Sequence, residues 1–336
     1  MPFLTESIFA GAARKVLARL CVGLCAALPG VAAQAAGDGA GPAVVASIAP
    51  IHSLAAMVME GVATPRLLLP TAMSPHDYAL KPSDARALAR ARLVIWVGPG
   101  LENFLEKPLA TLARRSEKLT LGKMAGLTLR RARGAGLWQA SDRGRGGSRQ
   151  KPSGQGRAPA PGGDLHIWLD PRNAIAMVGE MARVLARMDG ANGARYFANM
   201  RRAVAEISTL DAALEARLEP IRRVPYLVFH DAYGYFEGRY GLNAVGAVVV
   251  APDRRPGIKR LRAIRARLRR AGAACVFAEP QFPRARAAAL TEGTGAGVGV
   301  LDPVGVGLVP GPGLYPALLN GLADGLLACL AGRRRP

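Results

Sequence analysis

The sequence contains little histidine and little cysteine, with four residues of each among 336. Four cysteines are too few for a miniature disulfide scaffold, and a chain of this length can build a hydrophobic core without one. Aromatic residues make up only 5% of the chain, whereas hydrophobic residues make up half of it. The core must therefore consist mainly of Ala, Leu and Val, and wholesale disorder is excluded.

Several motifs of enzymes and nucleotide-binding proteins are also absent. No G-x-x-x-x-G-K-[ST] or G-x-G-x-x-G sequence follows a predicted strand, so no phosphate-binding loop is indicated. The sequences G-x-S-x-G and H-E-x-x-H are missing as well. The chain therefore carries no signature of the common hydrolase classes.

The N-terminal segment, residues 1–36, has the pattern of a cleavable secretory signal peptide. Basic residues up to Arg19 precede an apolar run over 20–31, and the small residues 32–36 are typical of a cleavage site. The apolar run is too short to cross a bilayer, and no other segment reaches about 18 apolar residues. We therefore expect a mature protein that is exported to the periplasm.

Acidic residues are scarce, because 24 Asp and Glu accompany 45 Lys and Arg and the formal net charge is +21. A charge of this size often indicates nucleic-acid binding, but an exported protein does not meet that partner. The densest basic stretch, 254–270, carries apolar residues at helical spacing, among them Ile264 and Leu268. It predicts an amphipathic helix whose basic face lies in solvent.

The remaining chain alternates between strand and helix patterns, which predicts α/β lobes with helices on both faces of parallel sheets. Apolar residues recur every three or four positions over 194–222 and predict one helix of about 42 Å. This helix would link an N-terminal lobe over 37–193 to a C-terminal lobe over 223–331. Apolar runs predict strands at 44–48, 66–69, 93–97, 165–169, 225–229, 244–250, 275–278 and 298–301.

Residues 131–163 interrupt this alternation. Gly, Ser, Arg and Pro dominate the stretch, no hydrophobic period remains, and Asp142 is its one acidic residue. The composition predicts a flexible, basic surface loop.

Polar residues that could bind a ligand lie at or near the ends of predicted strands. His76 follows the second strand, His166 lies within the fourth, and His230 and Asp302 end strands of the C-terminal lobe. Ligands of open α/β sheets bind at the carboxyl ends of strands, and three imidazoles with a carboxylate suit a metal such as zinc. A lone histidine at a strand end is more often structural, so spacing alone leaves both interpretations open.

Acidic residues close to these histidines are candidates for orienting them, since a metal-binding imidazole usually donates its second N–H to a carboxylate or carbonyl. Asp77, Asp170 and Asp231 each lie within four residues of one of the three. The fourth histidine, His52, begins a predicted helix, and we expect it to be structural.

Six short segments together carry a further signal. They are SPHDY at 74–78, KPSD at 81–84, HIWLDP at 166–171, FHDAYGYF at 229–236, CVFAEPQF at 275–282 and LDPVG at 301–305. In combination they resemble the cluster 9 family of solute-binding proteins of metal ABC importers, and in particular its zinc-binding members, over about residues 43–130 and 164–331. The resemblance implies two Rossmann-like α/β lobes joined by a long rigid helix, with Zn²⁺ held between the lobes and delivered to a membrane permease driven by a cytoplasmic ATPase.

The resemblance also implies a ligand set. His76, His166 and His230 match the three histidine ligands of the family, and Asp302 matches a carboxylate that completes the site in several members, a place taken elsewhere by water or a nearby Glu. Some zinc-binding members have that Glu directly before the first histidine, where this chain has Pro75. The third histidine favours zinc, because manganese-binding relatives tend to have a carboxylate there.

Cys275 and Cys329 match the disulfide of the zinc-binding members. They are the two cysteines left after removal of the signal peptide, and disulfides persist in an oxidising compartment. Two separate buried thiols are the alternative.

The loop 131–163 departs from the zinc-binding members, many of which fill it with His, Asp and Glu. It contains no histidine here, so a role in gathering zinc is not expected. We expect a monomeric zinc-capture protein and not an enzyme. The alternatives are a manganese or iron binder of the same architecture, and a zinc hydrolase in which Glu279 would act as general acid or base.

Overall fold

The computed structural model describes residues 41–76, 78–133, 136–138, 163–249, 258–281 and 285–332, all within one compact unit that spans 39–336. The predicted signal peptide 1–36 and residues 139–162 of the predicted loop lie outside the described residues. No helix within the described ranges is both long and apolar enough to cross a membrane.

The first half of the chain forms a parallel four-stranded sheet in the order β2-β1-β3-β4. Alternate residues of its strands point to opposite faces, so that Val44 packs toward α1 whereas Val45 packs toward Leu88 of α2. The predicted coverage of both faces by helices is thereby confirmed. The elements are β1 (Val44–Ala46), α1 (Ala49–Met59), β2 (Arg66–Leu67), α2 (Pro82–Arg90), β3 (Leu93–Trp96), α3 (Glu106–Thr111) and β4 (Glu117–Thr120).

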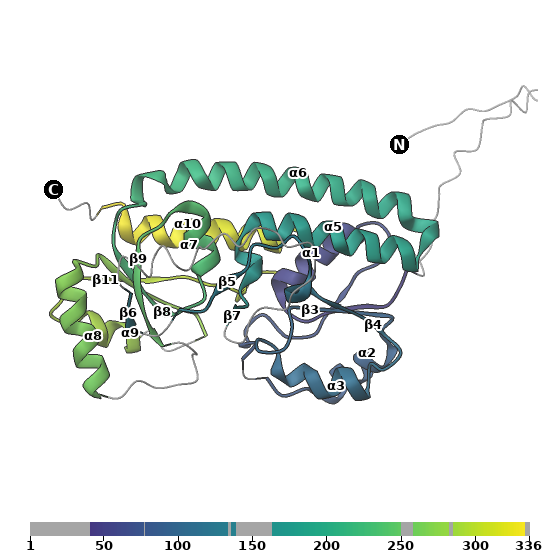
Figure 1. Ribbon diagram of the computed structural model, residues 1–336, viewed down its shortest axis with the longest axis horizontal. Helices are drawn as coiled ribbons and strands as arrows, with labels where there is room; N and C mark the ends of the chain where they lie inside the picture. The colour runs from purple at the N-terminus through teal and green to yellow at the C-terminus, as the bar shows by residue number, and fades with distance from the viewer. Residues whose placement is uncertain are drawn as a thin grey trace, which may run out of the picture. The chain divides into compact units, whose positions relative to one another are not determined.

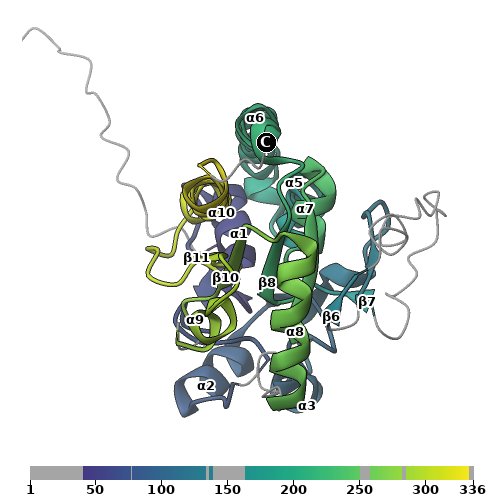
Figure 2. The same ribbon diagram turned by 90° about the vertical axis from the view of Figure 1, so that its left-hand side faces the viewer.

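The second half forms a five-stranded sheet in the order β11-β10-β8-β9-β6, in which β6 runs antiparallel to β9 and the other pairs are parallel. In Figure 2, α10 lies on one side of this sheet and α8 and α9 on the other. Ile264 and Leu268 of α8 are buried against the sheet, as the predicted amphipathic helix requires. The elements are β6 (Gly136–Leu137), β8 (Tyr226–His230), α7 (Gly234–Tyr240), β9 (Ala244–Val249), α8 (Ile258–Ala271), β10 (Cys275–Ala278), α9 (Ala285–Thr291) and β11 (Gly297–Val300).

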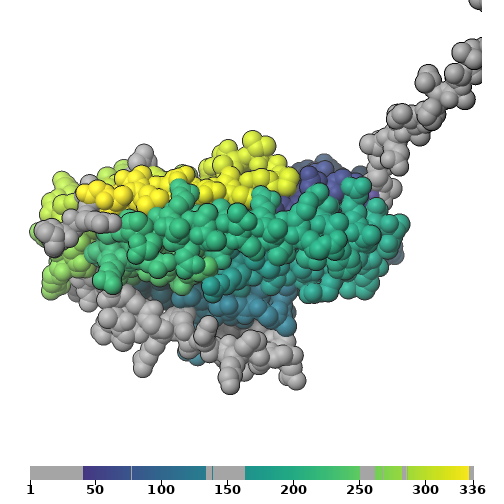
Figure 3. Space-filling view, turned by 90° about the horizontal axis from the view of Figure 1, so that it is seen from above, coloured from purple at the N-terminus to yellow at the C-terminus, as the bar shows by residue number. Residues whose placement is uncertain are grey.

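Three long helices connect the halves: α5 (Pro171–Met188), α6 (Gly193–Leu218) and α10 (Leu314–Leu330). Helix α6 runs alongside α5 and α10 (Figure 1), and it lies beside α10 across the face shown in Figure 3. Their buried residues join those of α1 and both sheets in one continuous hydrophobic core. The predicted fold class, α/β with parallel sheets and a long helix, is confirmed, whereas the lobe boundaries stay a prediction.

Helix α6 ends earlier than the predicted helix over 194–222. A 3₁₀ helix, Glu219–Ile221, follows it and contains Pro220 near its start. Proline has no backbone N–H and clashes with the preceding turn, so the α-helix cannot continue regularly through that position.

The predicted strand at 165–169 is wrong. Gly163–Asp164 (β7) pairs antiparallel with Arg130–Arg131 (β5), and Ile167–Leu169 forms a 3₁₀ helix. The run is apolar because its side chains are buried in the common core, a pattern that a short buried strand shares.

The predicted loop over 131–163 is likewise more structured at its ends than its composition indicates. Arg131 belongs to β5, Gly136–Leu137 forms β6 at the edge of the second sheet, and Gly163 begins β7. The backbone of Trp138 continues this attachment, because its N–H donates to the Val245 carbonyl at 2.9 Å.

Cys275 and Cys329 form a disulfide between β10 and α10, with a Cα–Cα distance of 6.3 Å. The bond links the sheet of the second half to the helix that closes the chain. The predicted pairing is confirmed, and the alternative of two separate thiols does not hold.

Candidate metal centre

Three histidines from distant parts of the chain meet at one point. His76 lies in the loop after β2, His166 directly precedes the 3₁₀ helix, and His230 is the last residue of β8. One ring nitrogen of each lies within 4.8 Å of those of the other two, and the ring centroids are 5.2–5.8 Å apart. Across the described residues, this is the one group of three or more His, Cys, Asp or Glu side chains that could hold an ion.

A cavity of about 10 Å³ lies among these rings. The rings of His166 and His230 are buried and that of His76 is half-buried, so an ion held here would be largely removed from solvent. The space suits an ion or a water molecule and is too small for an organic ligand. Its lining consists of Ser74, Pro75, His76, His166, His230, Glu279, Gln281, Pro303 and Val304.

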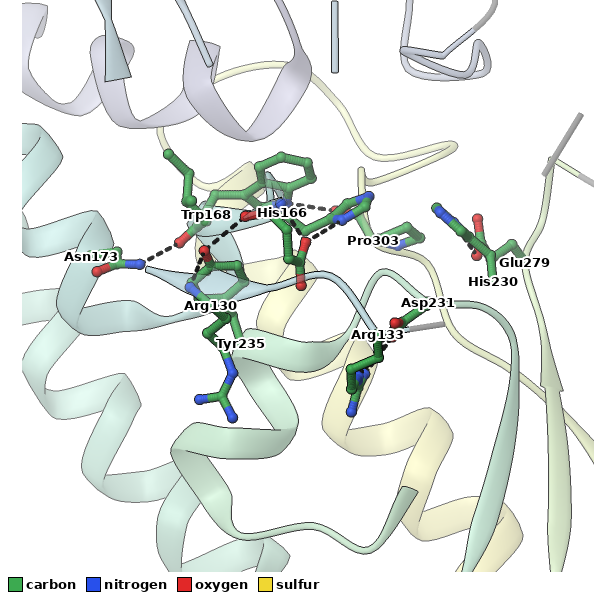
Figure 4. Close-up of polar contacts among 12 residues, drawn as sticks. Arg130, Arg133, His166, Trp168, Asn173, His230, Asp231, Tyr235, Glu279 and Pro303 are labelled. Atoms are coloured by element: carbon green, nitrogen blue, oxygen red, sulfur yellow. Dashed lines mark hydrogen bonds and ion pairs between the residues drawn. The ribbon is translucent and has the colours of Figure 1, made fainter. Parts of the chain in front are cut away.

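The orientation of His166 is fixed by Asp164. Oxygen Oδ1 of that carboxylate accepts both the backbone N–H of His166, at 2.9 Å, and its ring Nδ1–H, at 2.8 Å. Tyr235 holds the two-stranded ribbon of β5 and β7 in place, since its hydroxyl donates to the Asp164 carbonyl and accepts the Arg130 N–H (Figure 4). With Nδ1 protonated, Nε2 keeps its lone pair for a metal.

Glu279 orients His230 in the same way. Strand pairing places Phe277 of β10 beside Val228 of β8, so two residues later Glu279 stands beside His230. The Nδ1–H of His230 donates to Glu279 Oε1 at 3.1 Å (Figure 4). Burial lowers the pKa of His230, but the carboxylates of Glu279, Asp231 and Asp164 together outweigh it, Glu279 foremost, and the pKa is raised.

His76 has no such partner among the described residues. Its Nε2 is buried without a hydrogen bond, while its backbone N–H donates to Ser74 Oγ at 3.3 Å. Burial, and then the two neighbouring imidazoles, lower the pKa of His76 to about 3. Its imidazole is therefore neutral at physiological pH, the form that binds metals.

Two of the three aspartates suggested by sequence proximity serve other purposes, and the third, Asp77, lies outside the described residues. Asp170 caps α5 by accepting the Arg172 N–H at 2.9 Å. Asp231 forms an ion pair with Arg133. The carboxylates that do orient the histidines, Asp164 and Glu279, were missed in that role. The parallel register of the two strands could have indicated Glu279.

Arg133 is a second residue that sequence reasoning missed, because it falls in the predicted loop. Its guanidinium pairs with Asp231 and, at 2.6 Å, with Glu237, and it stacks 3.7 Å from the ring centroid of Trp138. Burial raises the pKa of both carboxyls and Arg133 opposes that shift. The pair attaches the segment after β5 to the second half, directly beside His230.

The structure does not bring Asp302 into the histidine cluster. Its Oδ1 accepts the backbone N–H groups of Val304 and Gly305 at 3.0 and 2.9 Å, and its Oδ2 accepts that of Val306. Burial raises the pKa of Asp302 while these three donors lower it. The carboxylate thus holds the loop after β11, two residues of which, Pro303 and Val304, line the cavity.

His52 lies away from the cluster, as its structural assignment requires. It is buried in α1, and its Nε2 bonds to the Pro65 carbonyl at 2.9 Å. The chain therefore divides its four histidines into three around one cavity and one in the core.

Comparison with known proteins identifies relatives that share most of the chain. Residues 44–329 match the family described as zinc-uptake complex component A, periplasmic. The high-affinity zinc uptake system protein ZnuA of Brucella suis biovar 1 is 39% identical in an alignment of 305 positions that covers 86% of this chain and 91% of that protein. The protein of the same name from Yersinia pestis is 36% identical over 293 residues, covering 87% and 92% of the two chains.

Solved structures share the fold at lower identity. A crystal structure of a zinc-bound ZnuA deletion mutant aligns with a TM-score of 0.70 at 22% identity, over 88% of this chain and all of that one. The manganese complex of the binding protein FpvC from Pseudomonas aeruginosa also aligns with a TM-score of 0.70, at 21% identity, over 87% and 99% of the chains. On the evidence of residues 44–329 and of these relatives, the chain belongs to the family of periplasmic zinc-uptake components, ZnuA.

Proposed function

We propose that this protein captures Zn²⁺ between its two halves and delivers it to the permease of an ABC importer driven by an ATPase. The observation that carries the proposal is the convergence of His76, His166 and His230, whose ligand atoms lie within 4.8 Å of one another. Membership of a zinc-uptake family and the names of the Brucella and Yersinia relatives support the same function.

Zinc fits this ligand set better than manganese or iron. Three neutral imidazoles are ligands that zinc accepts readily, whereas manganese prefers sites rich in oxygen. Asp164 and Glu279 each accept a hydrogen bond from the Nδ1–H of one ring, which leaves Nε2 of that ring to face the ion. The likeness to the manganese-bound FpvC shows a common fold and does not bear on the metal.

Binding is a better account of the site than catalysis. A zinc hydrolase needs a general acid or base that is free to exchange protons with the substrate. Glu279, the one candidate by motif, is buried and bonded to His230, and the cavity of about 10 Å³ leaves no space for a substrate. The protein is therefore proposed to be a carrier and not an enzyme.

The proposal includes export and a monomeric carrier. The family is described as periplasmic, which agrees with removal of residues 1–36 as a signal peptide before the protein acts. The net charge of the full chain is +21, but an exported protein does not encounter nucleic acid, and the proposed partners are the permease and its ATPase.

Metal content and zinc competition with a chelator test the proposal on the mature protein. We expect one tightly held zinc per chain, greatly weakened in His230→Ala. His52→Gln is the matched control, because it removes the histidine that lies outside the cluster and should leave the zinc stoichiometry unchanged. Zinc binding that is absent in the wild type, or unchanged in His230→Ala, would refute the proposed site.

A further inference from the structure

The metal cavity contains a second unpartnered polar atom besides His76 Nε2. Gln281, two residues beyond Glu279, lines the cavity, and its amide oxygen Oε1 is buried without a hydrogen bond to any described residue. A buried acceptor left without a donor is destabilising, because it has lost its hydrogen bonds to water without replacement. An unsatisfied group of this kind in a binding cavity indicates a partner that arrives with the ligand.

Three imidazoles leave one position of a tetrahedral zinc site to be filled. The polar side chains near that position are already engaged. Asp302 holds three backbone N–H groups, Glu279 Oε1 accepts from His230, and Ser74 Oγ accepts the His76 N–H. Among the described residues that line the cavity, Gln281 is the one with a side-chain oxygen, Oε1, that is buried without a hydrogen bond.

We propose that Gln281 completes the zinc site through one water molecule, which occupies the fourth position on the ion and donates a hydrogen bond to Gln281 Oε1. This inference rests on the proposed function, because it needs the ion to be held by the three histidines. A water bound to zinc gives its oxygen lone pair to the ion and acts toward its surroundings as a strong hydrogen-bond donor. An amide oxygen, which can only accept, is a suitable partner for it. A cavity this small leaves no space beside the ion for a ligand bulkier than water.

The choice of an amide has a consequence for selectivity. A carboxylate at this place would supply a charged oxygen ligand and move the site toward the oxygen-rich set that manganese prefers. The neutral Gln281 keeps the first shell to three nitrogens and a water. It thus acts as a positioning residue that sets both zinc affinity and the preference for zinc over manganese.

Two variants separate these roles. Gln281→Met keeps the length of the side chain and removes the acceptor, whereas Gln281→Glu keeps an acceptor oxygen and adds charge. We expect Gln281→Met to weaken zinc binding by about 10–100-fold, as loss of an outer hydrogen bond does in other metal sites. We expect Gln281→Glu to retain zinc affinity and to bind manganese more tightly than the wild type. Thermal unfolding of both metal-free variants checks that they fold as the wild type does.

Cobalt provides a spectroscopic reading of the fourth position. Azide should displace the water from the Co²⁺-loaded wild type and change its visible spectrum, and the starting spectrum of Gln281→Met should differ from that of the wild type. Unchanged zinc affinity in Gln281→Met, or a wild-type cobalt spectrum that does not respond to azide, would overturn the inference. If His230→Ala abolishes binding in the same experiments, the proposed function stands and only the role of Gln281 falls.

Discussion

Replacing Glu279 by Gln tests whether a carboxylate behind His230 sets the affinity for zinc. The substitution keeps the size of the side chain and leaves an amide oxygen that can still accept the Nδ1–H of His230. It removes the negative charge, which the structure places 3.1 Å from that nitrogen in a fully buried setting. A neutral acceptor stabilises the zinc-bound imidazole less than a carboxylate does.

The magnitude follows from the kind of hydrogen bond that is exchanged. Bonds to a charged group contribute about 1.5–3 kcal/mol and neutral ones about 0.5–1.5 kcal/mol, so the loss is about 1–2 kcal/mol. That corresponds to a zinc dissociation constant raised about 5–30-fold, close to the range found for outer groups of metal sites.

The assay is competitive zinc titration against a chelator, with the free energy of unfolding of the metal-free protein measured alongside. Glu292→Gln makes the same chemical change at an exposed position, where Glu292 meets Arg265 at 3.3 Å, and should leave zinc affinity unchanged. Equal zinc affinity in Glu279→Gln and the wild type would show that the buried carboxylate does not tune His230, and our account of the site would be wrong.

Three further predictions concern stability. Arg133→Met leaves the carboxylates of Asp231 and Glu237 buried without their cation, and should lower the free energy of unfolding by about 3–5 kcal/mol in urea titrations. Replacing Cys275 and Cys329 by Ser opens a cross-link that spans 54 residues and should lower it by about 2–4 kcal/mol. Burial raises the pKa of Glu102 to about 7, above its unfolded value near 4.5, so the folded state binds the proton more tightly. Stability should therefore fall by up to about 3 kcal/mol as the pH rises from 4.5 through 7, and less so in Glu102→Gln.

Each of these has a clear contrary result. A loss below about 1 kcal/mol in Arg133→Met would mean that the two carboxylates reach water or protonate at little cost. Identical urea midpoints for the oxidised wild type and the double serine variant would contradict the stabilising role of the disulfide. If wild type and Glu102→Gln share one pH profile between 5 and 8, the titrating group is not Glu102.

The strands and helices of this chain were largely predictable because their side chains follow simple periods. The predicted strand at 275–278 matches β10 residue for residue, and the predicted strand at 225–229 is displaced from β8 by one residue. The predicted strand at 244–250 begins where β9 begins, and its last residue lies outside the described residues. Prediction failed at 165–169, where an apolar run is buried in a 3₁₀ helix and not in a sheet. Hydrophobic periodicity alone cannot separate a short buried strand from a short buried 3₁₀ helix, since each is a continuous run of apolar side chains.

The sequence by itself determined which residue types were available for a site: four histidines, few acids, and three of those histidines at or near the ends of predicted strands. Resemblance to a family of metal-binding proteins then selected the same three. Local sequence patterns could not show that these side chains meet. His76 and His166 are 90 residues apart and His166 and His230 are 64 residues apart, so the distances between them depend on how the two sheets pack.

Only the tertiary structure decided how each histidine is held. The parallel register of β8 and β10 places Glu279 against Nδ1 of His230, and the β5–β7 ribbon places Asp164 against Nδ1 of His166. Asp302 instead accepts hydrogen bonds from the backbone of the loop that follows it. Buried polar groups must find partners wherever packing brings them. Their pairings are therefore set by the folded arrangement and not by neighbours in sequence, and this is why the nearby aspartates proved misleading.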